Sequence, residues 1–503
     1  MRNISGKIFS GALWMISLRL LQRSIGLIST VILARLLVPE DFGLVAMALA
    51  FYALIELISF LGFDAALIRK QHAQPIHFNT SWTLGIILKG FAGLLLVLLA
   101  PAVARFYHEP RVEALLYVFA LISVLGSLEN IGIVNFRKEL HFNLEFRFQL
   151  TKKLLSVIVT VVLALYFRSY WALVLGILAS TVFGVVLSYL MHPYRPKLCL
   201  TAWREILGFS SWMVLDHIVS FIRERGSDFV VGRYLSPQAL GAYRVGSDLA
   251  ALPTTQLYLP VLRAVFPGYA KIVDQPDTLR QIYLSTQAAI STLVLPVTVM
   301  MIILAEPIVL LLLGAKWYVA IPLVQALGCY GITRLLQGNR NALFVAKGKP
   351  SWLVFLGLLE VLLMFPLILY WVWQDAPVVM VAWAKVIAAL SALPFGVWLV
   401  CKMVKMTSLD FIATVWRPVS SCLLMSGFLY FLLPVLTFSQ YSVAVNAALQ
   451  LSILLPLATL VYISGIVSLW LLAGRPAGIE TTALTSLAQQ PRFKWLSQFL
   501  LTR

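Results

Sequence analysis

Residues 228–243 read DFVVGRYLSPQALGAY, and a shorter version of this stretch lies near the start of the chain. Residues 34–44 read ARLLVPEDFGL, whereas residues 232–242 read GRYLSPQALGA. Arginine, leucine, proline and glycine recur at a constant offset, first as Arg35, Leu37, Pro39 and Gly43 and then as Arg233, Leu235, Pro237 and Gly241. Each copy stands between two apolar runs, which indicates an internal repeat of the whole chain.

The composition predicts a membrane protein. The chain has 503 residues, of which 60% are hydrophobic and only 12% are charged, and its mean hydropathy is +0.90. Continuous apolar runs of about 18 or more residues are typical of membrane-spanning helices, and they are too long for barrel strands. We therefore expect an all-α integral membrane protein with about fourteen spans. These are placed at 10–36, 41–63, 81–101, 113–134, 149–167, 170–190, 207–233, 238–262, 283–304, 318–340, 352–373, 377–400, 417–436 and 443–472.

The net charge of +18 is interpreted as membrane topology rather than as a nucleic-acid site. With the N-terminus inside, 25 lysines and arginines fall in cytoplasmic segments and 6 in outer segments. This asymmetry predicts a multi-pass membrane protein with both termini in the cytoplasm. The four cysteines form no C-x-x-C pair, so neither a disulfide framework nor a metal site is expected, and no cofactor is implied.

The repeat also predicts the domain organisation. Six spans separate the two copies, which is an even number, so the two halves should run in the same direction through the membrane. We expect an N-terminal lobe at 1–200, a C-terminal lobe at 201–405, two further spans within 406–474 and a basic cytoplasmic tail at 475–503. In each copy, proline and glycine are expected to close a tight outer hairpin, while Arg35 and Arg233 reach the lipid headgroups.

Charged residues inside the predicted spans are the candidate functional residues, because such groups are costly in a bilayer. Arg19 and Arg23 lie one turn apart in the first span, with no acidic residue nearby. The seventh span, its counterpart in the second half, carries Arg223, Glu224, Arg225 and Asp228, and the tenth span carries Arg334. Since guanidinium groups bind phosphate in a bidentate manner, these arginines predict a cationic cavity for an anionic substrate.

The same residues have a structural interpretation. The charges of the seventh span could neutralise one another, and Arg244 could pair with Asp248 one turn along. Asp64, Glu224 and Asp228 are therefore candidates either for binding a coupling cation or for internal ion pairs. Arg19 and Arg23 have no such local partner, so an external anion or water should face them.

Several stretches together resemble the Wzx-type flippases of lipid-linked polysaccharide repeat units, within the multidrug/oligosaccharidyl-lipid/polysaccharide (MOP) exporter superfamily. They are ILARLLVPEDFGLVAMA (32–48), NTSWTLG (79–85), FRKELHF (136–142), SDFVVGRYLSPQALGAYRVGSDLAALP (227–253) and VFPGYAKI (265–272). Asp228 matches an acidic position of the family, and Arg233, Pro237 and Gly241 match its turn. Neither Arg19 and Arg23 nor the cluster Arg223–Arg225 corresponds to a family motif.

The resemblance implies two six-helix lobes that work by alternating access. The implied substrate is an undecaprenyl-pyrophosphate-linked oligosaccharide, moved from the cytoplasmic to the periplasmic leaflet for exopolysaccharide, capsule or lipopolysaccharide assembly. Membrane lipid, a proton or sodium ion, a polysaccharide polymerase and a chain-length regulator are the implied partners. Three alternatives stay open: a drug or metabolite antiporter, a lipid II flippase and, disfavoured by the short outer loops, a membrane glycosyltransferase or polymerase.

Overall fold

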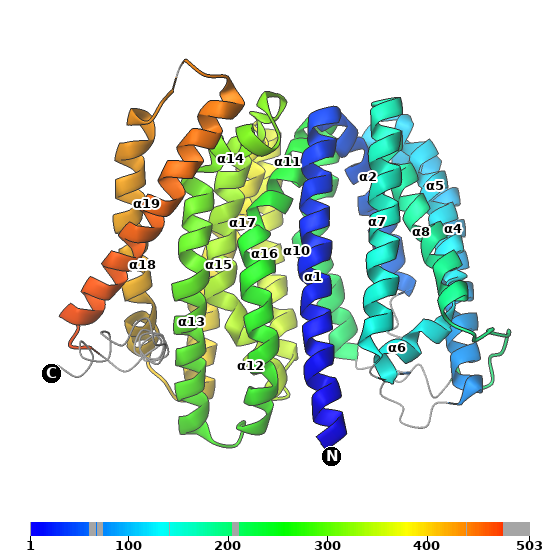
Figure 1. Ribbon diagram of the computed structural model, residues 1–503, viewed down its shortest axis with the longest axis horizontal. Coiled ribbons are helices and arrows are strands. Elements are labelled where there is room, and N and C mark those ends of the chain that lie inside the picture. The colour runs from blue at the N-terminus through cyan, green and yellow to red at the C-terminus, as the bar shows by residue number, and fades with distance from the viewer. Residues whose placement is uncertain are drawn as a thin grey trace. The chain divides into compact units, whose positions relative to one another are not determined.

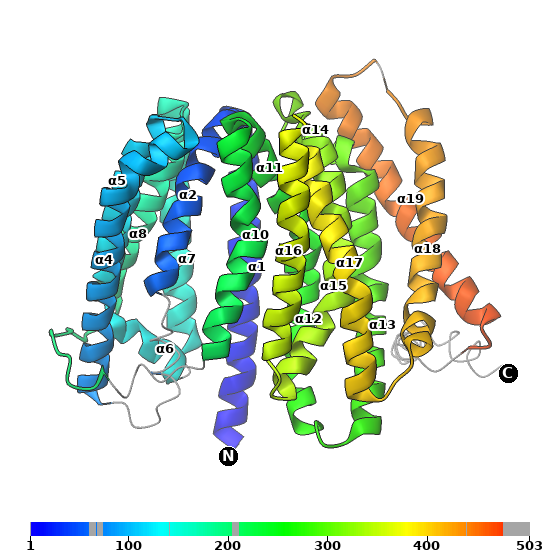
Figure 2. The same ribbon diagram turned by 180° about the vertical axis from the view of Figure 1, so that it is seen from behind.

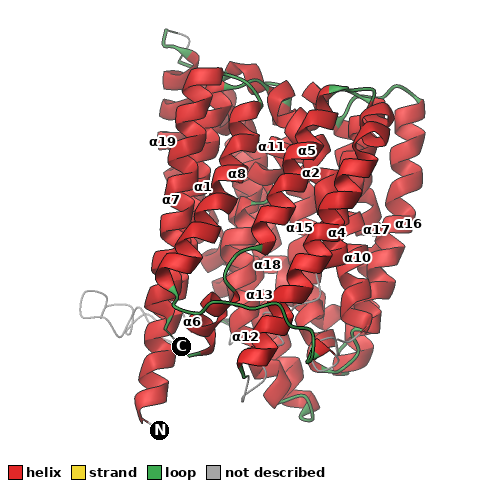
Figure 3. Cartoon of the chain, turned by 90° about the vertical axis from the view of Figure 1, so that its right-hand side faces the viewer, coloured by secondary structure: helices red, strands yellow, loops and turns green. Residues whose placement is uncertain are grey.

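The computed structural model describes residues 2–59, 67, 74–139, 141–203, 211–438 and 440–475. Over these residues the chain forms helices joined by short connections, and it contains no strand (Figure 3). The chain divides into two compact units, residues 1–244 and residues 245–503, which are described separately below. The predicted lobe limits at residues 200 and 405 stay a prediction.

Within the described residues, the first unit holds seven long helices and the start of an eighth. Among them α1 packs along α7, α4 packs along α5, and α10 packs against α2 and α4 (Figure 1). The chain bends by 64° where α5 gives way to the short helices η1 (Ile131–Ile133) and α6 (Val134–Lys138). The long helices are α1 (Arg2–Leu36), α2 (Pro39–Ser59), α4 (Pro75–Tyr107), α5 (Arg111–Ser127), α7 (Phe142–Phe167), α8 (Trp171–Met191), α10 (Ser211–Tyr234) and α11 (Pro237–Ala250).

The second unit is built around α13, α15 and α17, while α18 and α19 lie side by side (Figure 2). The chain enters this unit through the end of α11 and a π-helical turn, Thr254–Tyr258. Its helices are α12 (Leu259–Lys271), α13 (Pro276–Ile303), α14 (Ala305–Leu312), η3 (Ala315–Trp317), α15 (Ala320–Ala346), α16 (Ser351–Trp373), α17 (Val379–Val404), α18 (Ser408–Val435) and α19 (Val443–Leu472).

Nine helices in the described part of the chain are long and apolar enough to cross a membrane, or ten if the bent pair after Arg111 is counted as one span. This confirms a multi-pass, all-helical membrane protein. Every predicted range falls on one or more of the helices, but the total of fourteen stays a prediction. Helices outside the apolar set include α10, in which the charged residues of the seventh predicted span lower the hydropathy.

The two copies of the repeat lie against each other in the first unit. Pro39 and Pro237 begin α2 and α11, each after a connection of two residues. A side-chain carbon on Gly43 would overlap the carbonyl oxygen of Pro237, and one on Gly241 would overlap the carbonyl oxygen of Pro39. Both glycines lie inside helices and neither has a positive φ angle, so the sequence-based role in the turn was wrong for them. They are required because two helices approach each other closely.

Residues 192–203, which follow α8, form an extended strap along one end of the first unit. Asn130, fully buried at the bend after α5, donates to the carbonyl oxygen of Tyr194 at 2.7 Å and accepts from the amide of Gly132 at 2.9 Å. The hydroxyl of Tyr194 donates to Asn79 at 2.7 Å, and that Asn79 oxygen also accepts from the amide of Lys197 at 2.9 Å. The amide of Cys199 donates to Thr83 at 2.9 Å. The strap is therefore fixed to α4 and to the bend.

Candidate functional site

The first feature of the candidate site is a polar face on α1. Arg19 and Arg23 are exposed, and neither forms a hydrogen bond or an ion pair with the described part of the chain. At 100° per residue, Arg19, Arg23, Gly26 and Thr30 fall within about 60° of the helix circumference. Arg23 stands 13 residues before the end of α1 at Leu36, which corresponds to roughly 20 Å along the helix axis and places it well inside a bilayer core of about 30 Å.

Helix α7 lies beside this face. Trp14 of α1 contacts Phe146 of α7 with 4.8 Å between the ring centroids, and Leu33 and Ala164 share a cluster at the other end of the pair. Between these contacts, the Nζ atom of Lys153 lies 4.0 Å from the place where Gly26 would carry a Cβ atom. Lys153 is one of the 25 lysines and arginines that the sequence places in cytoplasmic segments, and it belongs to no predicted site.

Lys152, the preceding residue of α7, points elsewhere. Its Nζ atom lies 3.3 Å from Oε2 of Glu129, and the pair fits against Gly184 of α8, where a Cβ atom would stand 2.6 Å from Nζ. Lys153, by contrast, forms no ion pair or hydrogen bond with the described residues. Of two adjacent lysines, one is therefore neutralised inside the first unit and the other is not.

The second feature is a buried carboxylate on α10. Asp228 is only 1% exposed, and its Oδ2 atom lies 3.6 Å from Arg225 and 3.5 Å from Arg244. Ser227 and Tyr243 share a hydrogen bond of 3.1 Å beside this group. Arg244 thus reaches Asp228 across the α10–α11 turn, and its pairing with Asp248 stays a prediction. Since two guanidinium groups face one carboxylate, internal pairing is the role that the geometry of Asp228 favours.

Aromatic rings of α2 and α4 pack against α10 at Phe229 and Gly232, close to Asp228 in the sequence. Phe51 contacts the rings of Tyr107 and Phe229, with centroid distances of 5.6 and 5.0 Å. Gly232 makes room for Tyr107, because a Cβ atom there would stand 2.7 Å from the tyrosine ring. Arg233 stacks on Phe106 at 5.5 Å. This apolar surround strengthens the attraction between Asp228 and its arginines.

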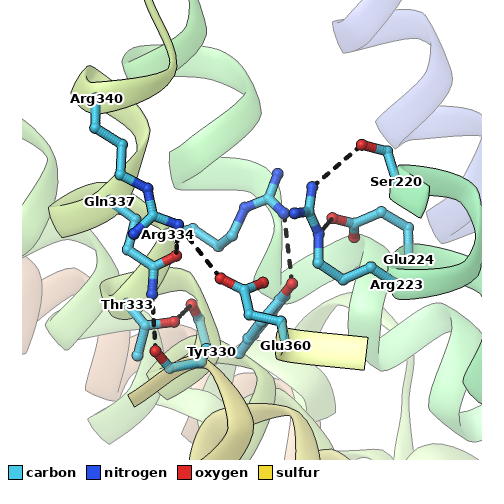
Figure 4. A network of polar contacts seen from close by, with 10 residues as sticks. Ser220, Arg223, Glu224, Tyr330, Thr333, Arg334, Gln337, Arg340 and Glu360 are labelled. Atoms are coloured by element: carbon cyan, nitrogen blue, oxygen red, sulfur yellow. Dashed lines mark hydrogen bonds and ion pairs between the residues drawn. The ribbon is translucent and has the colours of Figure 1, made fainter. Parts of the chain in front are cut away.

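The remaining predicted residues are Arg223 and Glu224 of the first unit and Arg334 of the second unit, and Figure 4 shows their polar contacts. In the first unit, Nε of Arg223 lies 3.7 Å from Glu224, and its Nη2 donates to Ser220 at 3.4 Å. In the second unit, Arg334 donates to the hydroxyl of Tyr330 at 3.4 Å and its guanidinium lies over the same ring at 5.9 Å.

A buried ion pair follows Arg334 by two turns of α15. Arg340 and Glu360 are 5% and 3% exposed, and Nη2 of Arg340 lies 3.5 Å from Oε1 of Glu360. The same nitrogen donates to Gln337 at 2.9 Å (Figure 4). The guanidinium fills the space that Gly396 leaves by having no side chain. This pair connects α15, α16 and α17 within the second unit.

The predicted site residues differ in their ion pairs. Arg19 and Arg23 form none with the described part of the chain, whereas Arg223, Arg225, Glu224 and Asp228 take part in ion pairs of α10. Asp64 lies outside the described residues. A single cavity that contains all five predicted arginines stays a prediction.

Comparison with known proteins decides the family. Residues 32–322 match the model of a family described as polysaccharide biosynthesis protein. The chain belongs to this family. It is 25% identical over 347 residues to the lipopolysaccharide biosynthesis protein WzxC of Escherichia coli (strain K12), a match that covers 68% of this chain and 70% of WzxC. The resemblance to Wzx-type proteins inferred from the sequence is thus confirmed.

Solved structures confirm the fold. The chain superposes on the lipid II flippase MurJ in an inward closed conformation with a TM-score of 0.66, 16% identity and coverage of 91% of this chain and 99% of MurJ. An inward-facing multidrug resistance transporter of the MATE family, from the MOP superfamily, gives a TM-score of 0.57 with 16% identity, over 77% of this chain and 96% of the transporter. At these identities the likeness establishes the membrane fold of the MOP superfamily and nothing further.

Proposed function

We propose that this member of the polysaccharide biosynthesis family is a transporter, not an enzyme, that moves a polyprenyl-pyrophosphate-linked oligosaccharide from one leaflet of a bacterial inner membrane to the other. The observation that carries the proposal is the pair Arg19 and Arg23, exposed on one face of a membrane helix and without an acidic partner in the described part of the chain. Two permanent charges at this depth need water or an anionic ligand. The pyrophosphate of a lipid carrier would supply that anion, while its polyprenyl chain stays in the bilayer.

The ion pairs of α10 support a division of tasks. Arg225, Arg244 and Asp228 hold α10 and the start of α11 together, so they are less suited than Arg19 and Arg23 to first contact with the substrate. Coupling to a proton or sodium ion would require Asp228 or Glu224 to exchange its arginine partner for that cation. Glu224, with a side chain that is 43% exposed, is the more accessible candidate for that exchange.

The proposed orientation has both termini in the cytoplasm, as the distribution of lysine and arginine predicts. Transport would then run from the cytoplasmic to the periplasmic leaflet by alternating access. A polymerase and a chain-length regulator would use the product on the periplasmic side.

The first test is the location of undecaprenyl-linked glycan in cells depleted of the protein. Complete repeat units that accumulate facing the cytoplasm support flipping, and their mass identifies the substrate. Glycans that stop short of a complete repeat unit would indicate a glycosyltransferase. Normal export would favour the alternative function, a drug or metabolite antiporter. Accumulation of lipid II instead would favour the lipid II flippase.

The second test addresses the arginines. Replacement of Arg19 and Arg23 by glutamine should abolish export without loss of the protein from the membrane, whereas lysine at both positions should retain part of it. Arg105, an exposed arginine at the end of α4, serves as a matched control because its one hydrogen bond within the described residues is to the carbonyl oxygen of Pro101. Normal export by the well-expressed double glutamine variant would overturn the proposal.

A further inference from the structure

We propose that Lys153 of α7 is a third phosphate-binding cation of this site and that it makes the protein prefer a pyrophosphate-linked lipid over a monophosphate-linked one. The inference rests on the proposed function. It assigns a role to a residue that belongs to no sequence motif and that stands 130 positions from Arg23.

Geometry brings Lys153 to the arginine face. Gly26 lies within about 60° of Arg19 and Arg23 on the circumference of α1 and follows Arg23 by three residues. The Nζ atom of Lys153 ends 4.0 Å from the Cβ position of Gly26, so the ammonium group reaches the polar face within one turn of Arg23. A larger residue in place of Gly26 would occupy the approach of the ammonium group.

The arrangement is electrostatically incomplete without an anion. Three cations on two packed helices repel one another, and the described residues offer none of them an ion-pair partner. Lys152, the neighbouring residue of α7, has a purely structural role: its charge is neutralised by Glu129 at a distance of 3.3 Å. The described residues offer Lys153 no equivalent acid, which indicates that its counter-charge arrives with a ligand.

The number of cations suits a pyrophosphate. A sugar-capped pyrophosphate carries one negative charge on each phosphate, whereas a sugar-capped monophosphate carries a single charge. Two arginines already provide enough donors for one phosphate in a bidentate manner. A lysine ammonium on a neighbouring helix would bind the other phosphate as a point charge. Lys153 should therefore contribute chiefly to binding of the pyrophosphate.

The experiment measures lipid binding by the full-length protein in nanodiscs. The probes are undecaprenyl pyrophosphoryl-glucose and undecaprenyl phosphoryl-glucose, titrated against the wild type and the variants K153Q, K153R and K152Q. We expect K153Q to weaken binding of the pyrophosphate lipid about tenfold, as the loss of one charge-assisted hydrogen bond predicts. Its binding of the monophosphate lipid should stay within about threefold of the wild type, and K153R should behave like the wild type.

Thermal unfolding of the ligand-free variants separates binding from structure. K153Q should melt at or above the wild-type temperature because it removes repulsion, whereas K152Q should melt lower because it leaves Glu129 without its partner. Wild-type affinity in K153Q, an equal loss for both lipids, or a drop in melting temperature as large as that of K152Q would each overturn the role of Lys153. If the wild type binds neither lipid, the proposed function itself fails.

Discussion

Replacement of Gly43 by alanine should destabilise the first unit, although the same change stabilises most helices. In an ordinary helix interior, alanine is favoured over glycine by about 0.5–1 kcal/mol. Here the added methyl group would overlap the main-chain carbonyl oxygen of Pro237, which cannot rotate away because it belongs to the first turn of α11. Overpacking of this kind costs about 1–3 kcal/mol or more, so we expect a net loss of about 2 kcal/mol.

The assay is thermal unfolding of the purified protein in detergent, followed by tryptophan fluorescence. For a unit of this size, about 2 kcal/mol corresponds to a fall in Tm of roughly 4–8 °C. Gly90→Ala is the matched control, since Gly90 lies in α4 with no atom within 4 Å of its Cβ position. That variant should melt at the wild-type temperature or slightly above it.

The reciprocal contact adds a second expectation. Because Gly241 meets Pro39 in the same way, one small separation of the two helices would relieve both overlaps. The double variant Gly43→Ala and Gly241→Ala should therefore lose clearly less stability than the sum of the two single variants. A Tm for Gly43→Ala that rises like that of the control, or strictly additive losses, would refute the close approach of α2 and α11.

Three further predictions concern charge and accessibility. Asp228→Asn should lower the free energy of unfolding, measured with denaturant, by about 2–3 kcal/mol. The loss should be smaller than for a fully buried ion pair, because the Arg225 side chain is 38% exposed. The Arg111 side chain lowers the pKa of Glu109 in the α4–α5 connection, so this carboxylate stabilises the fold above pH 4.5 and loses its effect as the pH falls through its lowered pKa. Glu109→Gln should therefore reduce Tm slightly at pH 7, and its difference from the wild type should shrink as the pH falls below 4.5. Hydrogen bonds from Thr201 lower the pKa of the Cys199 thiol. This thiol should therefore react at neutral pH with an impermeant maleimide in inverted vesicles but not in right-side-out vesicles. The buried Cys422 should react in neither preparation.

The position of the helices was predictable because the signal is local. Long apolar runs reveal a membrane helix without reference to its neighbours, and α19 (Val443–Leu472) matches its predicted limits. The repeat was visible for a similar reason, but the role of its glycines was not. Gly43 and Gly241 look like turn residues beside proline, and only the crossing of two helices about 200 residues apart gives their actual contact.

The candidate site was predictable only within single helices. Helical spacing placed Arg19 and Arg23 on one face and indicated that they lack a local acid. It could not predict that Arg244 reaches Asp228, or that Lys152 and Lys153 point to different helices, because these contacts depend on packing between helices. The sequence of two adjacent lysines does not show which of them contacts a carboxylate.

The strap at residues 192–203 has a mechanical consequence. An unattached chain of twelve residues can extend by roughly 40 Å and would absorb a pull from either end as slack. This segment is instead bonded at Tyr194, Lys197 and Cys199 to α4 and to the bend after α5. A displacement of the chain at residue 203 is therefore passed on to α4 and to the bend after α5, because the hydrogen-bonded segment cannot extend first. The segment acts as a rigid connection and not as a flexible linker.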